Sequence, residues 1–382
     1  MKKIMCVFMI CVLCTGCWDL EEINDVTIVV ATALDKSEDE KKYRASFQIP
    51  LPGELAPETG GGKPYYVDSS TGDAVTDINA RIQSRLPRKF IFSHRRLLLL
   101  GEPLAAEMGI QPLFDALTRT PQKRLTAYMA VTDGPAYPYF NIQSQMELYS
   151  GEMIRELIQS QGVYTQNLKN VMLKINQTGI EAIIPYIKLK ETKVSKQEKS
   201  KGQIELHGYA QLKEDKMVGT FTDDAAEGLL WMIKDAHPLN TSLQVNEDQF
   251  ISVNNIQSET SITPVVEGED ITFDLSLHVT CGVVEDSSNK NLFNNKNIEE
   301  VQQKVEEKIK RQMNEALELI KKNKADSIGF GLYIKHRYPY LWNQSLKKNW
   351  PEKIPSLAFH TNVDVTIENI GLISENLTKE EE

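Results

Sequence analysis

The residues near the amino end are of the types, and in the order, that lipid attachment to a cysteine requires. Lys2-Lys3 precedes an uncharged, almost wholly apolar run at 4–13. A short positive segment followed by a short apolar segment is typical of a secretory signal peptide. The run leads into Leu-Cys-Thr-Gly-Cys at 13–17. Gly16 is the small residue that a signal peptidase needs before the scissile bond, and Cys17 would supply the thiol that accepts the lipid.

The apolar run is too short to be a permanent anchor. A membrane-spanning helix needs roughly 20 apolar residues, whereas an acidic segment, 19–22, follows almost at once. We therefore predict cleavage between Gly16 and Cys17 and a diacylglyceryl group on Cys17, since two acyl chains anchor a protein stably. Cys14 departs from the usual signal, which has Leu at this position. The alternative is an ordinary secretory signal in which Cys17 is incidental.

The remaining cysteines agree with export. Three of the five lie within residues 1–16, so the mature chain keeps only Cys17 and Cys281. If Cys17 carries lipid, no intramolecular disulfide can form, and packing must stabilise the fold. Cys281 follows an alternating run, 271–279, which predicts a buried thiol at the end of a strand rather than a nucleophile.

Patterns that carry catalytic or metal chemistry are missing from the sequence. No two histidines lie within one helical turn, and none stands beside a cysteine pair: they are His94, His207, His237, His278, His336 and His360. The mature chain has no His-Glu-x-x-His, no Cys-x-x-Cys and no Gly-x-Ser-x-Gly. Ser93-His94 lies in a predicted strand, where adjacent side chains face opposite ways. The acidic residues are scattered and leave a carboxylate pair undecided, but we predict no enzyme, no metal and no cofactor.

Two glycine-rich segments superficially resemble phosphate-binding loops. Gly60-Gly61-Gly62-Lys63 is followed by Pro64, where a phosphate loop needs Ser or Thr. Gly329-Phe330-Gly331 lacks the third glycine of a dinucleotide loop and predicts a turn after a long helix. Neither segment therefore indicates a nucleotide site.

The composition favours an exported globular protein that does not bind nucleic acid. The chain has 382 residues and a formal net charge of −10, and loss of Lys2 and Lys3 with the signal makes it more acidic. Nucleic-acid binding requires clustered Lys and Arg. An acidic protein would not adhere electrostatically to an anionic bilayer either, so the lipid would have to hold it there. At roughly 150 residues per domain, the length predicts two or three domains.

The first part of the chain is predicted to be a mixed α/β domain over 26–190, behind a polar tether at 17–25. Apolar runs and alternation indicate strands, whereas apolar residues three or four apart indicate helices. The predicted order is strand 26–34, strand 43–49, helix 73–86, strand 90–100, helices 103–108 and 110–119, strand 125–131 and helix 146–161. This order of elements argues for a mixed α/β domain.

A charged stretch without apolar periodicity follows, residues 188–201. It is a linker or an exposed hairpin, and we place the linker at 191–201. Beyond it we predict a small middle domain over 202–248 and a C-terminal α/β domain over 249–375. Their strands are expected at 204–212, at 217–221, at 250–281 (two or three strands) and at 362–370. Asp223 is placed to cap a helix in the middle domain.

The clearest single element is a long amphipathic helix over 297–324. Apolar residues recur along it three or four positions apart: Ile298, Val301, Val305, Ile309, Met313, Ala316, Leu317 and Ile320. The other positions are nearly all charged or amide residues, which predicts a solvated helix with one buried stripe. Packing on the chain's own sheet and a coiled coil both fit the stripe, and we favour the sheet. The fold class is thus α+β, with largely antiparallel or mixed sheets.

Several segments resemble those of one bacterial family, and they occur in the family's order along nearly the whole mature chain. The mature start is Cys-Trp-Asp-Leu-Glu-Glu-Ile-Asn-Asp at 17–25. The others are Phe92-Ser93-His94 with 97–102, Gly109-Ile110, Arg119 and Pro121; then Gly208-Tyr209-Ala210, 215–219 and 228–231; then 326–331, Trp342 and 347–350. On these segments the chain resembles the Ger(x)C family, the lipoprotein C subunits of spore germinant receptors.

The resemblance implies a multidomain α/β fold without catalytic activity or cofactor. It also implies a location on the outer surface of the spore inner membrane, with lipid on Cys17. The implied partners are the integral-membrane A and B subunits of a germinant receptor, which acts in nutrient-triggered germination. Gly329-Phe330-Gly331 and Trp350 then have two interpretations, a turn with a core aromatic or a subunit contact, and we favour the first.

Two other classes of function compete with this one. A solute-binding lipoprotein would deliver a small ligand to a membrane transporter and would need two similar lobes of doubly wound parallel sheet. The antiparallel-looking strand pairs and the single long helix argue against such lobes. A cell-wall or cortex enzyme would need a catalytic constellation that the sequence does not offer.

Overall fold

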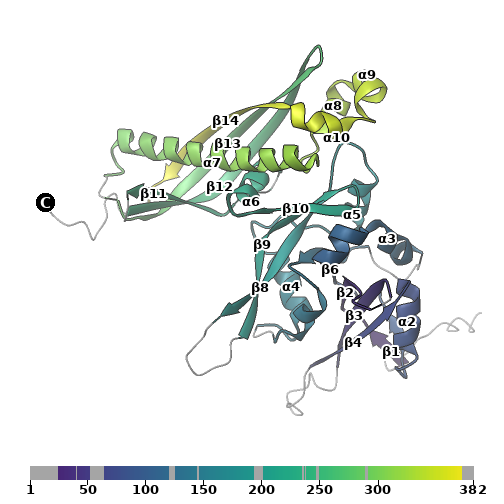
Figure 1. The fold of residues 1–382 in the computed structure, drawn as a ribbon. Helices are drawn as coiled ribbons and strands as arrows, with labels where there is room; N and C mark the ends of the chain where they lie inside the picture. Colours follow the sequence, from purple (N-terminus) through teal and green to yellow (C-terminus); the bar gives the residue numbers. More distant parts are fainter. Residues whose placement is uncertain are drawn as a thin grey trace, which may run out of the picture.

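A large sheet and a smaller sheet lie side by side in the computed structural model of the chain (Figure 1). The structure describes residues 25–39, 41–51, 64–119, 125–143, 146–192, 201–234, 236, 238–246, 249–288 and 291–371. The predicted signal, Gly16, Cys17, the glycine-rich segment 60–63 and His237 lie outside these residues. So does 193–200 of the predicted linker.

The larger sheet has eight strands in the order β10-β9-β8-β7-β6-β2-β3-β4. Their bounds are β2 Ala31–Lys36, β3 Tyr43–Pro50, β4 Tyr65–Gly72, β6 Leu97–Gly101, β7 Tyr128–Thr132, β8 Ile183–Thr192, β9 Lys201–Lys213 and β10 Lys216–Thr222. The four central strands β2, β6, β7 and β8 are parallel, and an antiparallel pair flanks them on each side. The leucines of β6 are at most 1% exposed, as expected for a parallel strand covered on both faces. The predicted mixed sheet is confirmed.

Two predicted strands are broken, and both breaks occur at the same end of the sheet. Residues 26–34 divide into β1 (Val26–Ile28) and β2, and 90–100 divide into β5 (Lys89–Ile91) and β6. β1 and β5 form a separate parallel pair. Arg96 N donates to Val30 O at 2.7 Å where the chain enters the large sheet. Ser93-His94 lies in a turn, so the prediction of a strand there was wrong.

Helices cover both faces of the large sheet. One face packs against α2 (Val75–Gln83), the π-helix η3 (Leu104–Met108), α3 (Gln111–Thr118) and α5 (Leu168–Ile175). The other packs against the 3₁₀-helix η4 (Tyr137–Asn141) and α4 (Ser150–Ile158). Alternate residues of β6 point to opposite faces, Leu98 and Leu100 to the first and Leu97 and Leu99 to the second. The helices expected at 73–86, 103–119 and 146–161 are therefore confirmed, with shorter bounds.

The segment between the two predicted main domains is shared between the sheets. β8 and β9 are arms of a hairpin, paired as far as Thr192 and Lys201, and β9 continues through the turn at Glu214 into β10. Next, α6 (Asp223–Met232) packs on the long helix, and β11 (Asn240–Asn246) joins the smaller sheet. The elements expected in a separate middle domain thus lie in both sheets. The division of the chain into three independently folding domains stays a prediction, which limited proteolysis can test.

The smaller sheet has the order β11-β12-β13-β14. Two long strands fill 250–281, β12 (Gln249–Glu267) and β13 (Asp270–Asp286), and β14 (Ala358–Asn369) closes the sheet. β13 and β14 are parallel, whereas the other pairs are antiparallel. The connection to β14 runs through α7 (Asn295–Asn323), α8 (Phe330–Arg337), α9 (Pro339–Leu341), η5 (Trp342–Leu346), α10 (Trp350–Lys353) and η6 (Ile354–Ser356).

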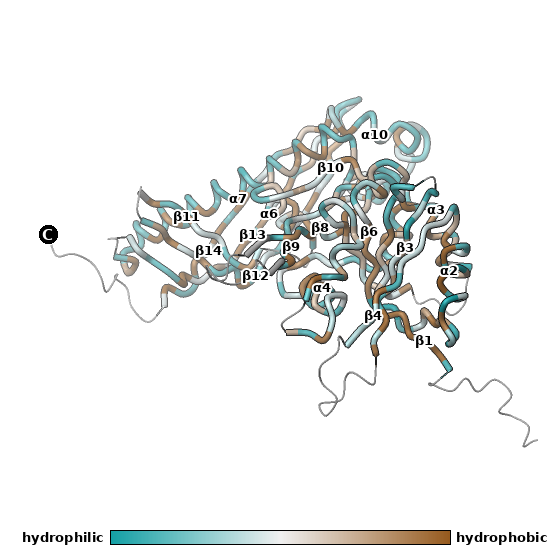
Figure 2. Tube along the Cα trace, turned by 60° about the horizontal axis from the view of Figure 1, so that its bottom comes forward, coloured by the Kyte–Doolittle hydropathy of each residue, from teal (hydrophilic) through white to brown (hydrophobic). Residues whose placement is uncertain are grey.

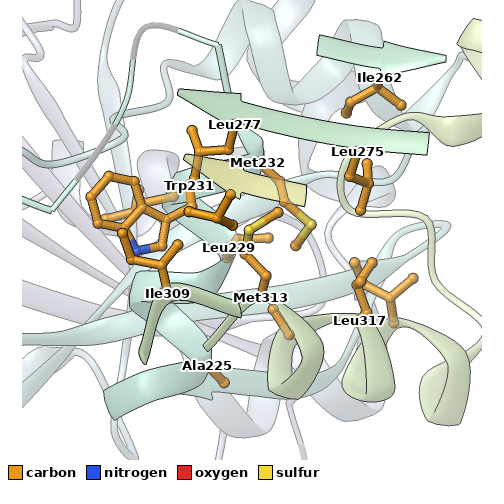
Figure 3. Close-up of a cluster of buried hydrophobic side chains, with 14 of the residues drawn as sticks. Ala225, Leu229, Trp231, Met232, Ile262, Leu275, Leu277, Ile309, Met313 and Leu317 are labelled. Atoms are coloured by element: carbon orange, nitrogen blue, oxygen red, sulfur yellow. The ribbon is translucent and has the colours of Figure 1, made fainter. Parts of the chain in front are cut away.

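The long helix α7 lies across the smaller sheet (Figure 1) and buries its apolar stripe there. Figure 2 shows hydrophobic and hydrophilic positions alternating along it. In Figure 3, Ile309, Met313 and Leu317 of α7 face Leu275 and Leu277 of β13, with α6 side chains between them. The prediction that the helix packs on its own sheet is confirmed. Among the helices of the described ranges, none combines the length and apolar character needed to cross a membrane.

Candidate functional site

The chemistry-bearing residues outside the amino-terminal signal are far apart or buried. Cys281 is fully buried within β13, and its Sγ donates to Asn255 Oδ1 at 3.4 Å. Burial raises the pKa of this thiol to about 11, so it stays protonated and unreactive at neutral pH. The prediction of a buried thiol is confirmed, although it lies inside the strand rather than at its end.

The histidines do not gather. His278 Nδ1 lies 2.7 Å from Asp364 Oδ2, and His360 Nδ1 lies 3.2 Å from Asp274 Oδ1. Both pairs are exposed links between the neighbouring strands β13 and β14. Within the ranges that the structure describes, no three His, Cys, Asp or Glu side chains are placed to hold a metal ion.

A buried carboxylate organises the segment that follows α7. Asp326 is 1% exposed and accepts hydrogen bonds from the backbone N–H groups of Gly329 (2.7 Å), Phe330 (2.8 Å) and Gly331 (2.8 Å). The indole Nε1–H of Trp350 donates a fourth bond, also at 2.8 Å. Burial raises the pKa of Asp326 while these four donors oppose the rise. The carboxylate therefore holds the first turn of α8 and the start of α10 in one place.

The glycines of this segment are required by close packing. Gly329 has a φ of 91°, a conformation that glycine adopts without a steric penalty. A Cβ at Gly331 would lie 2.6 Å from Gly179 Cα and 2.8 Å from the ring of Trp342. Trp342 and Trp350 pack edge to face with centroids 5.4 Å apart. The prediction that Trp350 is a core aromatic is confirmed. Gly329-Phe330-Gly331 is not the predicted turn, because Gly329 is the N-cap residue of α8 and Phe330 and Gly331 are its first residues.

The same segment connects the two sheets. Gln211 of β9 is 1% exposed and donates from Nε2 to Ala325 O (3.1 Å) and to Ser327 Oγ (3.0 Å). Asn323 Nδ2 in turn donates to Gln211 Oε1 at 2.7 Å. Glu181 N, just before β8, donates to Asp326 O at 2.7 Å. We call residues 323–331 with Gln211 and Glu181 the junction.

A second contact between the sheets is the crossing of α6 and α7. A Cβ added at Gly228 would overlap the carbonyl oxygen of Gln312, so the two backbones touch. Trp231 Nε1 donates to Gln312 Oε1 at 3.1 Å, and Gln312 Nε2 donates to Asp224 Oδ1 at 2.9 Å. The prediction that Asp223 caps α6 was wrong, because Thr222 is the N-cap residue and no side chain caps the helix. Asp223 instead takes a left-handed conformation at the first helical position.

The junction contains one carboxyl group that titrates near neutrality. Burial raises the pKa of Glu181 to about 7, and the nearby charge of Asp326 adds to the rise, although Glu214 N donates to Glu181 Oε2 at 2.8 Å. The folded state therefore binds this proton more tightly than the unfolded chain, whose pKa is near 4.5. Its contribution to stability is present below that unfolded value and is lost as the pH rises through about 7.

We expect Glu181→Gln to remove this dependence. The variant should match the parent protein at pH 4 and exceed its free energy of unfolding by about 1–3 kcal/mol at pH 8. Denaturant unfolding at both pH values measures the difference. Glu269→Gln removes a charge from the exposed turn between β12 and β13, outside the junction, and should leave the pH profile unchanged. Equal profiles for the parent protein and Glu181→Gln would contradict the assignment.

Sequence reasoning singled out part of the junction but missed its polar links. Asp326 and Trp350 stood out only as parts of family-like segments, and Gly329 and Gly331 also as a predicted turn. Gln211 and Gln312 were not considered, although Gln312 lies within the apolar stripe of α7. An isolated amide on that buried face was the signal that could have found Gln312, because buried polar groups are nearly always hydrogen-bonded.

Comparison with known proteins agrees with the resemblance. Residues 19–189 match the family described as "Spore germination protein N-terminal domain", and 207–371 match "Spore germination B3/ GerAC like, C-terminal". "Putative spore germination protein YfkR" of Bacillus subtilis (strain 168) is 31% identical over 377 residues, 97% of each chain. "Spore germination protein B3" of the same organism is 23% identical, over 96% of each chain.

A solved structure has the same fold. The crystal structure of the GerBC protein superposes with a TM-score of 0.59 at 18% sequence identity, covering 92% of this chain and all of that chain. The two family matches follow one another along the chain and together cover most of it. The full-length relatives are spore germination proteins as well. The chain therefore belongs to the GerAC-like family of spore germination proteins.

Proposed function

We propose that the protein is a lipid-anchored, non-enzymatic subunit of a spore germinant receptor that acts in nutrient-triggered germination. The observation that carries this proposal is similarity along 97% of the chain to a spore germination protein of matching length. The lipid would sit on Cys17, at the outer surface of the spore inner membrane.

The anchor would act through a short tether. Positions 17–25 separate the modified cysteine from the first described residue, Asp25, and β1 begins at Val26. An extended chain covers at most about 3.6 Å per residue, so β1 would lie within roughly 30 Å of the bilayer surface. The large sheet would thus be the membrane-proximal part. Integral-membrane A and B subunits would meet the protein there.

The junction gives this arrangement a mechanical consequence. Buried hydrogen bonds and two glycine-dependent contacts join the large sheet to the smaller one. Movement imposed on the large sheet by a membrane partner would therefore be passed to the smaller sheet rather than absorbed by a flexible linker. In this proposal the protein transmits the state of its partners through rigid contact.

Cys17→Ala tests the anchor. The variant is expected to move from the membrane fraction to the soluble fraction of spores, because no acyl chain can attach, and nutrient-triggered germination through this receptor should fall at least tenfold. Mass spectrometry of the mature amino terminus gives the lipid directly. Cys14→Leu, which restores the usual residue of the signal, is the matched control and should keep both lipid and germination. A Cys17→Ala protein that stays membrane-bound and germinates normally would refute the anchor.

Co-purification tests the partners. From detergent-solubilised spore membranes, the tagged full-length protein should bring down two integral-membrane proteins in constant ratio. Recovery of the protein alone, under conditions that keep receptor complexes intact, would contradict the proposed subunit role. The solute-binding alternative has less support, because the two sheets differ in strand number and topology and do not form two similar lobes.

A further inference from the structure

A polar cavity of about 630 Å³ opens at the amino ends of the parallel strands β2, β6 and β7. Three arginines line it: Arg95 and Arg96, which directly precede β6, and Arg155 of α4. Ser93 and Tyr128 add hydroxyl groups to the wall. The broken strand at 90–100 creates this cavity, since a continuous strand would not present neighbouring side chains on one wall.

Arg95 is buried without a counter-charge among the described residues. The residue borders the cavity and is 3% exposed, and its Nε and Nη2 are buried with no hydrogen-bond partner among the residues that the structure describes. Desolvation lowers the pKa of the guanidinium to about 10, so it stays charged at neutral pH. An unpaired buried charge is costly, and buried charges in proteins are paired as a rule. In the part of the chain that the structure describes, Arg95 therefore lacks the anion that a buried guanidinium requires.

The nearby carboxylates are already engaged by the other two arginines. Glu152 Oε1 lies 2.8 Å from Arg96 Nη1 and 2.6 Å from Arg155 Nη2, and Arg155 also contacts Glu156. The described lining includes neither Asp nor Glu. Two carboxylates thus pair with two of the three guanidinium groups, and within the described residues the charge of Arg95 is not matched.

The opposite end of the same strands is closed. Asp35 at the end of β2 accepts bonds from Ala136 N (2.5 Å) and Tyr137 N (3.0 Å), and Gly101 of β6 packs against its carboxylate. Parallel sheets commonly bind ligands at their carboxyl ends, but here the protein's own Asp35 fills that position. The amino end is the one with room and unmatched charge.

We propose that this cavity binds an oxyanion, the carboxylate or phosphate of a small molecule, with Arg95 as its main contact. A guanidinium has a forked pair of donors that matches both groups. Because Nε and Nη2 of Arg95 are buried, the side chain would turn toward the cavity when it binds the ligand. The volume is in the range of small-molecule sites, and Ile28, Val30 and Pro50 supply an apolar wall for the remainder of the ligand. This site lies beyond the receptor role proposed above and does not depend on it.

The oxyanion could be free or part of a lipid headgroup, because β1 borders the cavity and follows the tether. Thermal unfolding of the full-length chain in neutral detergent distinguishes these sources. The probes are succinate, inorganic phosphate, and monomeric dihexanoyl phosphatidylglycerol with dihexanoyl phosphatidylcholine as its zwitterionic control. A rise in Tm with succinate or phosphate supports a free ligand. A rise only with the anionic lipid supports a headgroup. No rise with any probe overturns the proposal.

Arg95→Gln tests whether the rise in Tm comes from binding at this cavity. The variant is expected to weaken binding of the active probe roughly 10- to 100-fold, the size of a lost charge-assisted contact. Arg81→Gln removes an exposed arginine of α2 as the matched control and should bind as the parent does. Arg95→Lys keeps the charge without the fork and should bind at an intermediate level. Unchanged binding in both Arg95 variants would refute the site.

One measurement needs no variant. Succinamide has nearly the shape of succinate but no charge, so it should give no protection to the parent protein if the cavity selects an oxyanion. Equal protection by the two compounds would contradict the proposal even if Arg95→Gln failed to fold.

Discussion

Asp326→Ala is expected to destabilise the protein by about 3–5 kcal/mol, the cost of removing one side of a buried, hydrogen-bonded charge. The substitution leaves the N–H groups of Gly329, Phe330 and Gly331 and the indole of Trp350 without their acceptor. Each unsatisfied buried donor costs about 1–3 kcal/mol, but water that enters the space recovers part of the loss. Denaturant unfolding of the full-length chain in detergent measures the difference.

The control for this prediction is an aspartate that is also paired but exposed. Asp364 lies beside His278 on the surface of the smaller sheet, and Asp364→Ala should cost less than about 1 kcal/mol, as exposed ion pairs do. Asp326→Asn tests the chemistry at constant shape. Its amide can accept at one oxygen but must turn an NH₂ group toward two of the four donors, so an intermediate loss is expected. A loss below about 1 kcal/mol for Asp326→Ala would mean that the carboxylate does not hold the segment.

The regular elements with strong periodicity were predictable from the sequence. The stripe of α7 reflects a single buried face, which the order of apolar residues encodes directly. The alternation of β3 predicted a strand correctly, although its polar residues Ser46 and Gln48 are buried as well. Strand breaks were only partly predictable in this way. Residues 26–34 are apolar apart from two threonines, and nothing in that run marks the point where the chain passes from β1 into β2. In 90–100 the polar run Ser93-His94-Arg95-Arg96 marks the break between β5 and β6, and the prediction of one continuous strand overlooked it.

The candidate sites were predictable only in part. The lipid site proposed at Cys17 rests on local sequence alone, since a signal peptidase reads a linear segment, and it stays a prediction. The junction and the cavity depend on contacts between residues far apart in the chain, such as Gln211 with Ala325 and Arg96 with Glu152. Their residues carry no common spacing. Arg95 directly follows Phe92-Ser93-His94, one of the family-like segments. Only the three-dimensional structure shows that no described residue pairs with its Nε and Nη2.

The crossing of α6 and α7 determines how firmly the two sheets are joined. Besides the junction, α6 also links the two sheets. It directly follows β10 of the large sheet and packs against α7, which covers the smaller sheet (Figure 3). Gly228 is where the helices touch most closely. A change there would act on the connection between the sheets while leaving every polar group of the junction in place.

Gly228→Ala is expected to destabilise the protein by at least about 2 kcal/mol, in the range for overpacking a tight contact. In an ordinary helix interior the same change is stabilising by about 1 kcal/mol, because Ala restricts the unfolded chain and favours the helix. The sign reverses here because the added Cβ would overlap the backbone oxygen of Gln312. A backbone group cannot rotate away, so α6 and α7 must separate and weaken the bond from Trp231 to Gln312.

Gly282→Ala of β13 is the matched control, since its Cβ would approach Asn254 Oδ1 at 2.7 Å, the end of a flexible side chain outside the junction, and the next atoms, those of Asn369, lie at 3.6 Å. We expect it to change stability by less than about 1 kcal/mol. Thermal and denaturant unfolding compare the two variants, and germination of spores that carry each variant at normal abundance reports on the connection itself. If rigid contact passes the state of the large sheet to the smaller one, Gly228→Ala should impair germination even in spores that retain the protein at its usual level. Stabilisation by Gly228→Ala would show that the helices do not touch at this position.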